Sequence, residues 1–527
     1  MFFIQEIING NILKKQSYNN SLYGWKHVII LFIVVGILRF LFVLVGGIDL
    51  DPEEAQYWLW SKYPDWSYYS KPPLIAYING ISSLIFGNHA WAVRLNAIII
   101  GSIIGLTTYY ISNKLYKSKK LAFFIAAALL LLPAYHYISM FFTTDVLVSL
   151  FWLLTCYFFW KAIESNSLKY WILTGITIGI GSMAKYALLF FIPFSFLYLL
   201  FKKKYLLKQK SFYISLLIAI IIFSPVLIWN INNNMIGLFH ISNLAGYGRK
   251  FVSLHKTINY ELEFFGGQLL LNLPLLFLLF FWKKYKIGSY LKGDFEQFII
   301  YKMIFIYIIF TAIALIKRVQ INWLIFSYIP LYIILFKAIW ESEILNNTLS
   351  RNYIAFTSLL LVLLLLQPVL ETHTPKFSKI IPAKIDPYGK LVDWKNLTNF
   401  VNNEMKIKTN GNGYIILSDK YQIASQLSFY SPGNPKTYCL PYSGRRMNQF
   451  DVWGIPTSGF DDKQIVLVKN SPIESSEEIN FLIDRNSIIY STNYHIFYKG
   501  KIIKTYYIYL LNRMPKINSL KNVIAKY

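Results

Sequence analysis

Carboxylates and aromatic side chains are concentrated in one short stretch of the sequence, from Gly47 to Pro73. The chain has only 26 acidic residues, and this stretch contains Asp49, Asp51, Glu53, Glu54 and Asp65. Lys71 closes it, and its aromatic residues are Tyr57, Trp58, Trp60, Trp66, Tyr68 and Tyr69. A carboxylate can act as a general base, a lysine can hold an anion, and aromatic rings suit an amphipathic ligand. The stretch is therefore a candidate site for proton transfer and anion binding.

Composition places this stretch in a membrane protein. The chain is 55% hydrophobic and 18% aromatic, with a mean hydropathy of +0.42, which is typical of a polytopic membrane protein. Its net charge is +26, but the basic residues lie mainly in short loops between apolar runs, so nucleic acid is not an expected partner. A solvated acidic loop within an interfacial aromatic belt is the alternative interpretation of residues 47–73. Cys156 and Cys439 lie in unlike surroundings, so neither a disulfide nor a cysteine metal site is expected.

Apolar runs and charge predict the topology. A crossing helix needs about 20 apolar residues, and candidate runs cover 27–46, 90–112, 121–140, 145–163, 169–184, 186–201, 212–230, 262–282, 298–316, 320–338 and 352–370. Lysines cluster at 114–120, 202–210 and 283–286. If these clusters and Lys14 and Lys15 face the cytoplasm, about eleven runs cross, and 73–87 is an interfacial or re-entrant helix. The N terminus is then inside, the tail outside, and the first run a retained anchor.

This topology gathers possible chemistry on the outer face. The 47–73 loop, the loop around Asp145, the 231–261 loop and residues 317–323 all lie there. Cations are expected to be few on this side, so those present are candidates for holding phosphate; they are Lys71, Lys185, His240, Arg249, Lys250, His255, Lys317 and Arg318. Ordinary outer-loop cations are the alternative, because orientation depends only on the sum of charges.

Beyond residue 371 the apolar runs become shorter and alternate with polar residues. Alternating segments predict strands at 413–417, 464–468, 487–490, 495–498 and 506–510, with a helix at 420–430 between the first two. The chain therefore divides into a transmembrane domain, 1–370, which includes the first outer loop 47–88, and a soluble α/β domain, 371–527. We expect the tail domain to carry no catalytic carboxylate. Its Ser443–Arg446 segment either reaches toward anionic headgroups or is a solvated turn.

Motifs in a consistent order give a family resemblance. P-E-E-A-Q-Y-W-L-W and D-W-S-Y-Y-S-K-P-P-L-I-A-Y in the first loop resemble the [DE]-E-A-x-Y-W and D-W-x-Y-[FY]-x-[KH]-P-P segments of the GT-C membrane glycosyltransferases. Further matches are F-T-T-D-V-L (142–147), A-K-Y (184–186), I-N-W followed by Pro330, S-D-K-Y-Q-I-A-S-Q-L-S-F-Y (418–430) and G-R-R-M-N-Q-F-D-V-W (444–453). The chain resembles bacterial protein-O-mannosyltransferase-like enzymes of glycosyltransferase family 39 and, more distantly, the lipid A aminoarabinose transferases.

The resemblance implies a GT-C fold of about 11–13 transmembrane helices and an enzyme of the bacterial inner membrane. Such an enzyme moves a sugar, with inversion, from a polyprenyl (undecaprenyl) phosphate carrier to lipid A, lipopolysaccharide or another cell-envelope glycolipid or glycan on the periplasmic face. Three alternatives stay open: a serine or threonine acceptor in a protein, a lipid or glycan transporter or flippase, and a non-catalytic assembly protein. A transporter needs ionisable residues near the middle of the bilayer, where the predicted spans place only Arg39 and a few polar residues.

The resemblance also assigns residues. Glu53 falls on the family's catalytic acid, where many relatives have aspartate; Glu54 stands beside it, and Asp51 is the fallback. Asp145 matches the second acidic loop, and Lys71 a phosphate-contacting lysine. Glu53, Asp145 and Lys71 are expected to meet in one outward-facing cavity. The further substrate and phosphate contacts expected are Arg318, Tyr57, Trp58, Tyr69, Lys185, Arg249 and His240.

An anionic phosphate leaving group needs charge neutralisation, which lysine, arginine or a metal ion supplies. No metal ligand is predicted. Ser70 stands where the aminoarabinose transferases have a glutamate, which weakens a metal site built on that position. A divalent cation is the one cofactor left open.

Overall fold

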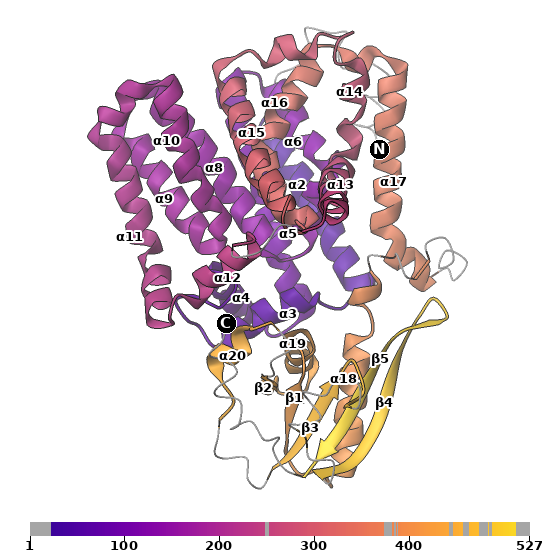
Figure 1. Cartoon of the computed structure of the whole chain (residues 1–527). Coiled ribbons are helices and arrows are strands. Elements are labelled where there is room, and N and C mark those ends of the chain that lie inside the picture. Colours follow the sequence, from indigo (N-terminus) through magenta and orange to yellow (C-terminus); the bar gives the residue numbers. More distant parts are fainter. Residues whose placement is uncertain are drawn as a thin grey trace. The chain divides into compact units, whose positions relative to one another are not determined.

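The computed structural model describes residues 23–247, 252–373, 382–383, 386, 388–441, 446–456, 463–473, 483 and 487–512. Two compact units can be distinguished, and each is described by itself (Figure 1). The helical unit comprises Met1–Phe42, Lys71–Ile75 and Arg94–Leu366; the mixed unit comprises Val43–Ser70, Ala76–Val93 and Gln367–Tyr527.

The helical unit is built from helices joined by short turns. They are α2 (Trp25–Val45), α5 (Ala90–Tyr116), α6 (Lys119–Ala128), α7 (Pro133–Met140), α8 (Thr144–Ser165), α9 (Leu168–Ala184), α10 (Phe191–Lys202), α11 (Lys210–Asn232), α12 (Ile236–Leu244), α13 (Leu254–Leu271), α14 (Phe277–Phe281), α15 (Asp294–Ala314), α16 (Tyr328–Glu341) and α17 (Thr348–His373). Two 3-10 turns, η3 (Tyr186–Phe190) and η7 (Ile321–Ser327), matter for the site.

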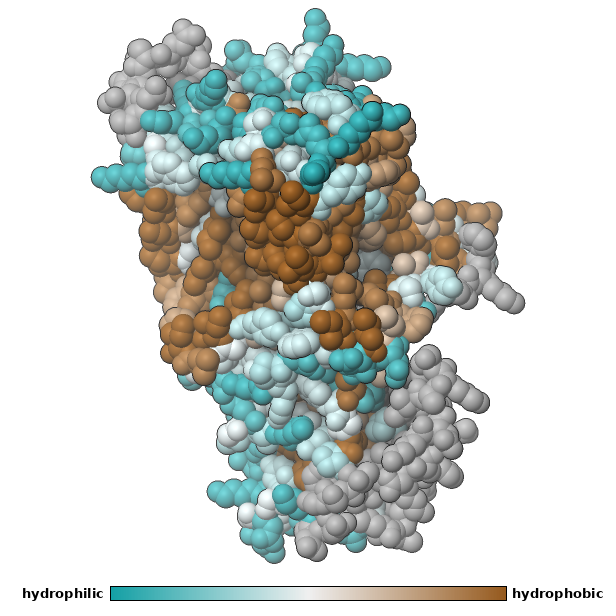
Figure 2. All heavy atoms as spheres, turned by 90° about the vertical axis from the view of Figure 1, so that its left-hand side faces the viewer, coloured by the Kyte–Doolittle hydropathy of each residue, from teal (hydrophilic) through white to brown (hydrophobic). Residues whose placement is uncertain are grey.

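Long apolar helices confirm a polytopic membrane protein. Among the described residues, six helices are long and apolar enough to cross a bilayer, or up to eight if two bent pairs each form one span. Apolar side chains such as Leu217, Ile220 and Ile221 on α11 are exposed, and Figure 2 shows a broad hydrophobic band on one face of the molecule. The predicted total of about 11–13 crossings stays a prediction.

Two apolar runs expected as straight spans are bent instead. The 121–140 run divides into α6 and α7, at an angle of 76°, and the 262–282 run bends by 77° between α13 and α14. Proline stands at each break, because Pro133 begins α7 and Pro274 lies in the short turn between α13 and α14. A proline removes a backbone donor and its ring clashes with the preceding turn, so a helix cannot run straight through it.

The mixed unit contains a five-stranded sheet in the order β2-β1-β3-β5-β4. Its strands are β1 (Tyr414–Ser418), β2 (Thr437–Cys439), β3 (Gln464–Lys469), β4 (Ile488–Tyr498) and β5 (Lys501–Leu511). β1 pairs in parallel with β2 and β3, whereas β5 pairs antiparallel with β3 and β4. The unit's helices are α3 (Pro52–Lys62), α4 (Leu74–Phe86), α18 (Trp394–Lys408), α19 (Tyr421–Tyr430) and α20 (Gln449–Trp453). The predicted α/β tail is confirmed.

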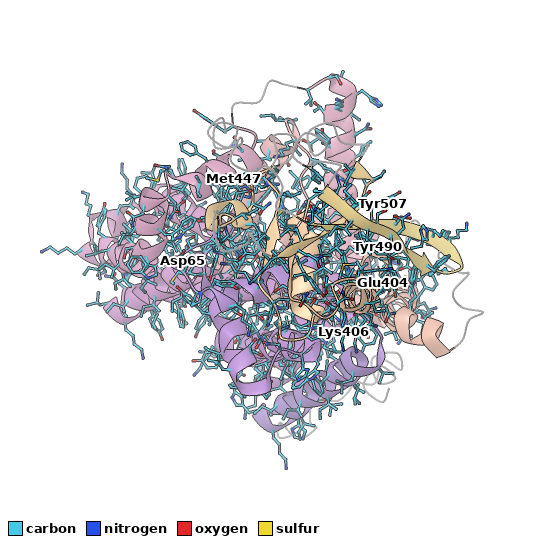
Figure 3. All side chains as sticks on the ribbon, turned by 90° about the horizontal axis from the view of Figure 1, so that it is seen from below. Asp65, Glu404, Lys406, Met447, Tyr490 and Tyr507 are labelled. Carbon is cyan, nitrogen blue, oxygen red and sulfur yellow. The ribbon has the colours of Figure 1, made fainter. Side chains whose placement is uncertain are left out.

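Both faces of the sheet are buried. Side chains of α18 and α19, including Leu397, Val401 and Leu427, pack with Val466 and Ile508 on one face. The other face holds a second cluster, formed by Ile415, Leu417, Tyr438, Leu440, Ile465, Leu467, Ile473, Ile483, Tyr509 and Leu511. α18 is further tied to the edge strand β4, because the Tyr490 hydroxyl donates to Glu404 at 2.8 Å; both residues are labelled in Figure 3.

Residues 47–70 of the acidic stretch belong to the mixed unit. Tyr430 Oη accepts from the Leu50 amide at 2.8 Å, and Gln426 Nε2 donates to the Leu50 carbonyl at 2.6 Å. The Asp49 carboxylate accepts from the backbone amide of Trp394 at 2.7 Å. The compact units therefore place the first loop with the tail, whereas the division at 370/371 places it with the transmembrane domain. As a statement about domains, that division stays a prediction.

α4 covers most of the 73–87 segment that was expected to be interfacial. It has 13 residues, fewer than the roughly 20 that a crossing helix needs. Ile81, Leu84, Ile85 and Phe86 are exposed along it, as expected for a helix with one face in lipid.

Candidate active site

The helix carrying the predicted catalytic acid, α3, has a strongly defined start. Asp51 is its N-cap, accepting from the Glu53 amide at 2.9 Å, while Glu54 Oε2 accepts from the Asp51 amide at 2.9 Å. Pro52 occupies the first helical position, where a missing N–H costs nothing. Lys390 adds an ion pair to Asp51 Oδ2 at 2.7 Å. Asp51 and the fully buried Glu54 are thus engaged in holding the helix.

Glu53 is the carboxylate of this group that stays exposed. Its carboxylate accepts a local hydrogen bond of 3.1 Å from the Tyr57 hydroxyl, one helical turn later. Tyr421, at the start of α19, also interacts electrostatically with the Glu53 carboxylate. Burial raises the pKa of Tyr421, with the carboxylates of Glu53 and Asp51 adding to the shift and Arg446 opposing it. Glu53 is therefore an exposed carboxylate whose position is held by the Tyr57 hydroxyl.

Most aromatic side chains of the first loop form core. Trp58 is fully buried, donates its indole N–H to Asn88 Oδ1 at 3.1 Å and packs edge-on against Phe429. Because the ring is fully buried in this structure, the predicted contact of Trp58 with substrate stays a prediction. Trp60 stacks on Tyr68 with ring centres 4.5 Å apart. Tyr69 is 9% exposed.

A second polar cluster lies in the helical unit, centred on Asp145. Lys185 Nζ is 2.6 Å from Asp145 Oδ1, and Asn322 Nδ2 donates to Asp145 Oδ2 at 2.8 Å. The Asp145 side chain is 2% exposed and that of Lys185 is 13% exposed. The three residues come from the F-T-T-D-V-L, A-K-Y and I-N-W motifs, which are far apart in the sequence. Both carboxylate oxygens of Asp145 are occupied, which suits orienting Lys185 better than accepting a proton.

Each member of this cluster stands at the end of an element. Asp145 lies in the first turn of α8, where Thr143 caps the helix by accepting from the Asp145 amide. Lys185 is an extended residue between α9 and η3, and Asn322 lies in η7. These helix ends bring the three side chains together without distorting a helix.

Buried polar residues that the sequence analysis did not name hold η7 in place. Gln268 Nε2 donates to the Ile321 carbonyl at 3.2 Å, and the Tyr328 hydroxyl donates to Gln268 Oε1 at 2.6 Å. Lys302 Nζ donates to the Ser327 carbonyl at 2.8 Å. Lys302 is fully buried near the middle of α15, so a charged residue besides Arg39 lies inside a candidate membrane span. A lysine inside an apolar run is itself the signal that could have revealed it.

The other predicted cations have varied settings. Arg318 pairs with Glu263 at 2.5 Å on the surface, with side chains 71% and 50% exposed. Lys317 donates to the Asn243 carbonyl at 3.0 Å, and His240 is buried within α12. Arg249, Lys250 and Arg445 lie outside the described residues. Lys71 belongs to the helical unit and Glu53 to the mixed unit, so the convergence of Glu53, Lys71 and Asp145 stays a prediction.

No group of three or more His, Cys, Asp or Glu side chains in the described part of the chain is placed to hold a metal ion.

The fold and the motif residues together define a class. Crystal structures of ArnT from Cupriavidus metallidurans, in the apo state and bound to undecaprenyl phosphate, share the fold with TM-scores of 0.60 at 12% identity. The matches cover 91% and 92% of this chain, and 97% and 98% of those chains. The protein is a polytopic membrane protein with the GT-C fold, as predicted.

Sequence comparison shows which proteins the chain is similar to. Residues 70–229 match the family model described as dolichyl-phosphate-mannose-protein mannosyltransferase, and the family resemblance predicted from the motifs is confirmed. The lipid A galacturonosyltransferase RgtD of Rhizobium johnstonii is 25% identical over 57% of this chain and 63% of its own length. The undecaprenyl phosphate-alpha-4-amino-4-deoxy-L-arabinose arabinosyl transferase of Wigglesworthia glossinidia brevipalpis is 28% identical over 31% of this chain and 32% of its own length. These similarities thus span less than two thirds of each relative.

Proposed function

We propose that this protein is an integral-membrane glycosyltransferase that moves a sugar from undecaprenyl phosphate to lipid A or a related envelope glycolipid on the periplasmic face, with inversion. The Asp145–Lys185–Asn322 cluster carries the proposal, since three separate family motifs meet in it. The named relatives act on lipid A or use undecaprenyl-phosphate sugars, and one ArnT structure contains the carrier.

The chemistry assigns different tasks to the two sites. The departing phosphate is anionic, so cations that neutralise its charge lower the barrier. Lys185 is a candidate, because Asp145 and Asn322 fix its position; Lys71 and Arg318 are the others. An acceptor hydroxyl needs a base within hydrogen-bond reach, and the exposed carboxylate of Glu53 fills this role. The acceptor then attacks the face of the sugar opposite the phosphate.

The family description favours a second acceptor, a serine or threonine of a protein. The donor and the carrier chemistry are the same in both cases, and only the acceptor differs. Both candidates are therefore tested in one assay.

The purified protein, in liposomes with an undecaprenyl-phosphate sugar, is expected to transfer the sugar to lipid A and not to a serine- and threonine-rich peptide. Transfer is followed by mass spectrometry of both acceptors. Lipid A from cells with and without the gene should differ by the mass of one sugar residue. If the sugar is transferred only to the peptide, the acceptor is a protein and not lipid A. If it is transferred to neither, the proposed function is contradicted.

Arg318 provides a prediction about donor binding. An exposed ion pair stabilises a protein by at most about 1 kcal/mol, so Arg318→Ala should scarcely change the unfolding temperature. We expect it to raise the half-saturating donor concentration, because a guanidinium offers two parallel hydrogen bonds to phosphate. Glu263→Gln is the matched control, since it removes the partner of Arg318 and leaves the cation. If Arg318→Ala changes neither half-saturation nor maximal rate, Arg318 only anchors the membrane edge.

A further inference from the structure

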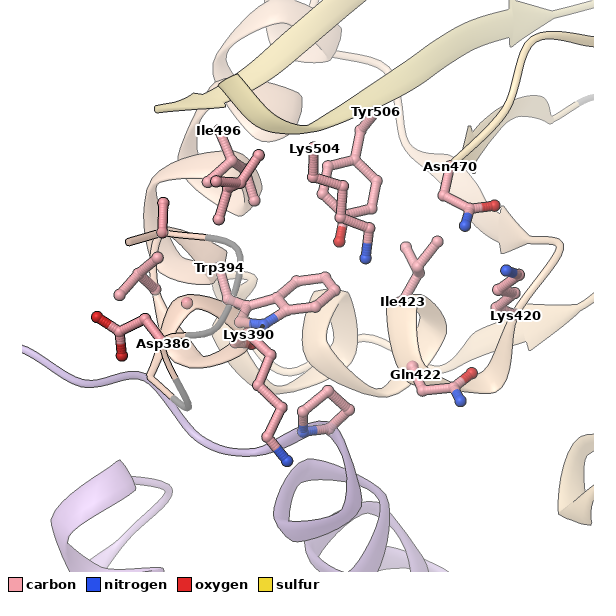
Figure 4. A pocket seen from close by; sticks show the side chains of 15 residues that line it. Asp386, Lys390, Trp394, Lys420, Gln422, Ile423, Asn470, Ile496, Lys504 and Tyr506 are labelled. Carbon is pink, nitrogen blue, oxygen red and sulfur yellow. Dashed lines mark hydrogen bonds between the residues drawn. The ribbon is translucent and has the colours of Figure 1, made fainter. Parts of the chain in front are cut away.

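A cavity lies within the mixed unit, between the sheet and its helices. Its volume is about 570 Å³, within the range of roughly 300–1,000 Å³ that is typical of small-molecule sites. Figure 4 shows Lys504 and Tyr506 entering it from the strand side, opposite Trp394. Pro52, the first residue of α3 and the neighbour of Glu53, also lines it. A bare phosphate ion would fill a small part of this volume.

The charges lining the cavity are unbalanced. Lys390, Lys420 and Lys504 contribute cations, and Asp386 is the one carboxylate among the lining residues. Asp386 is already neutralised, because it forms an ion pair with Lys499 and accepts from the Tyr498 hydroxyl at 2.8 Å. Lys390 is paired with Asp51. The excess positive charge therefore rests on Lys420 and Lys504.

Lys504 is held by aromatic rings and not by a carboxylate. Its Nζ lies 4.6 Å from the ring centre of Tyr506 and 5.3 Å from that of Trp394, and among the described residues it has no ion pair. Burial, followed by the nearby Lys420, lowers the pKa of Lys504 to about 8, while Asp419 opposes the shift. A neighbouring ring hydroxyl, that of Tyr506, is fully buried and has no hydrogen-bond partner in the described part of the chain. A cation and a hydroxyl that lack an acceptor are what an anionic oxygen satisfies.

The groups around Lys504 leave a net positive charge. The side-chain amide of Asn470 lies between Lys420 and Asp419, with one amide atom 2.8 Å from Lys420 Nζ and the other 3.2 Å from Asp419 Oδ2. Burial raises the pKa of Asp419, although Lys469 and Lys420 oppose the shift. Three ammonium groups thus surround one carboxylate.

The rest of the lining suits an organic group. Apolar side chains come from Val392, Ile423, Ile496 and Ile503, and the amides of Gln422 and Asn470 can bond hydroxyls. A sugar ring presents C–H groups on its faces and hydroxyls around its edge, which matches this mixture. A phosphate on that sugar matches Lys504, Lys420 and the Tyr506 hydroxyl.

We propose that this cavity binds the phosphate monoester of a sugar, and that the sugar belongs to the acceptor. The assignment of the sugar to the acceptor rests on the proposed function. It is made because Pro52 both lines the cavity and begins α3, the helix that carries Glu53. The phosphate anchors the acceptor, while the hydroxyl to be glycosylated is left to the site at Glu53.

Calorimetric titration of the full chain in detergent tests the cavity, with glucose 1-phosphate, glucose and inorganic phosphate as probes. Glucose 1-phosphate should bind saturably, and at least tenfold more tightly than glucose or inorganic phosphate. Lys504→Gln should weaken this binding at least tenfold, whereas Lys501→Gln, an exposed lysine on the same strand, should not change it. Raising the pH from 7 to 9 should also weaken binding, because Lys504 loses its proton while the phosphate, with a second pKa of about 6, stays fully ionised.

Competition and transfer identify the source of the ligand. If the ligand is a lipid headgroup, lipid A in mixed micelles should displace glucose 1-phosphate. If lipid A does not displace it, the ligand is a soluble sugar phosphate, and the assignment to the acceptor is wrong. No saturable binding up to about 10 mM, or equal binding by the Lys504→Gln variant, would overturn the cavity proposal even if transfer to lipid A is observed. If glucose 1-phosphate binds but no acceptor receives a sugar, the cavity proposal is supported and the proposed function is contradicted.

Discussion

Replacing Glu53 by glutamine is expected to lower sugar transfer to a hydroxyl acceptor by about 100-fold or more, because a positioned general base contributes ~10²–10⁴-fold. The amide nearly keeps the shape of the side chain but can no longer accept the proton. Folding should be unaffected, because the Glu53 side chain is exposed and glutamine can still accept the hydrogen bond from Tyr57. The measurement is the rate of transfer from an undecaprenyl-phosphate sugar in liposomes, beside the unfolding temperature in detergent.

Asp65→Asn is the matched control, since it removes a carboxylate from the same stretch without touching the start of α3. It should keep wild-type turnover. If Glu53→Gln also keeps it, the base lies elsewhere, and Asp51 and Glu54 become the residues to test. Their variants should in addition unfold more easily, because both side chains form the capping box of α3, and such a cap stabilises a helix by about 1 kcal/mol.

The second large effect is expected at Asp145. Asp145→Leu leaves the ammonium of Lys185 buried without its partner, and breaking a buried pair in this way costs about 3–5 kcal/mol. Lys185→Met leaves the carboxylate with Asn322 alone and should also be destabilising. Both single variants should lose transfer activity. Thermal unfolding and transfer rates are measured on the same detergent preparations.

The double variant, Asp145→Leu with Lys185→Met, separates a structural role from a chemical one. Apolar side chains of similar volume often replace a buried ion pair without loss of stability, so the double variant should unfold at a higher temperature than either single variant. It should remain inactive, because the positioned ammonium of Lys185 is no longer there to neutralise the phosphate. A double variant that regains both stability and activity would show that the pair only supports the fold.

Local chemistry predicted the membrane class and most element positions, and it named candidate site residues whose roles stay predictions. Long apolar runs and lysine-rich loops report membrane spans directly, and the predicted helix at 420–430 is confirmed as α19. The strands predicted at 487–490 and 495–498 are one strand, β4, since polar residues between them continue the pairing with β5. α18 was missed, although Leu397, Val401 and Met405 recur at the four-residue spacing of a helix face.

The sequence by itself determined which residues could do chemistry, because the types of side chain and their motifs depend only on the chain. Only the tertiary structure decided how each is used. The sequence alone does not distinguish the carboxylates of Asp51, Glu53 and Glu54. In the structure, Asp51 and Glu54 cap the helix, whereas Glu53 is exposed. The sequence suggests that Trp58 is a ligand-binding ring, whereas in the structure the ring is buried against Asn88 and Phe429. Asp145, Lys185 and Asn322 meet because α8, η3 and η7 pack together, and spacing along a chain carries no information about such contacts between distant segments.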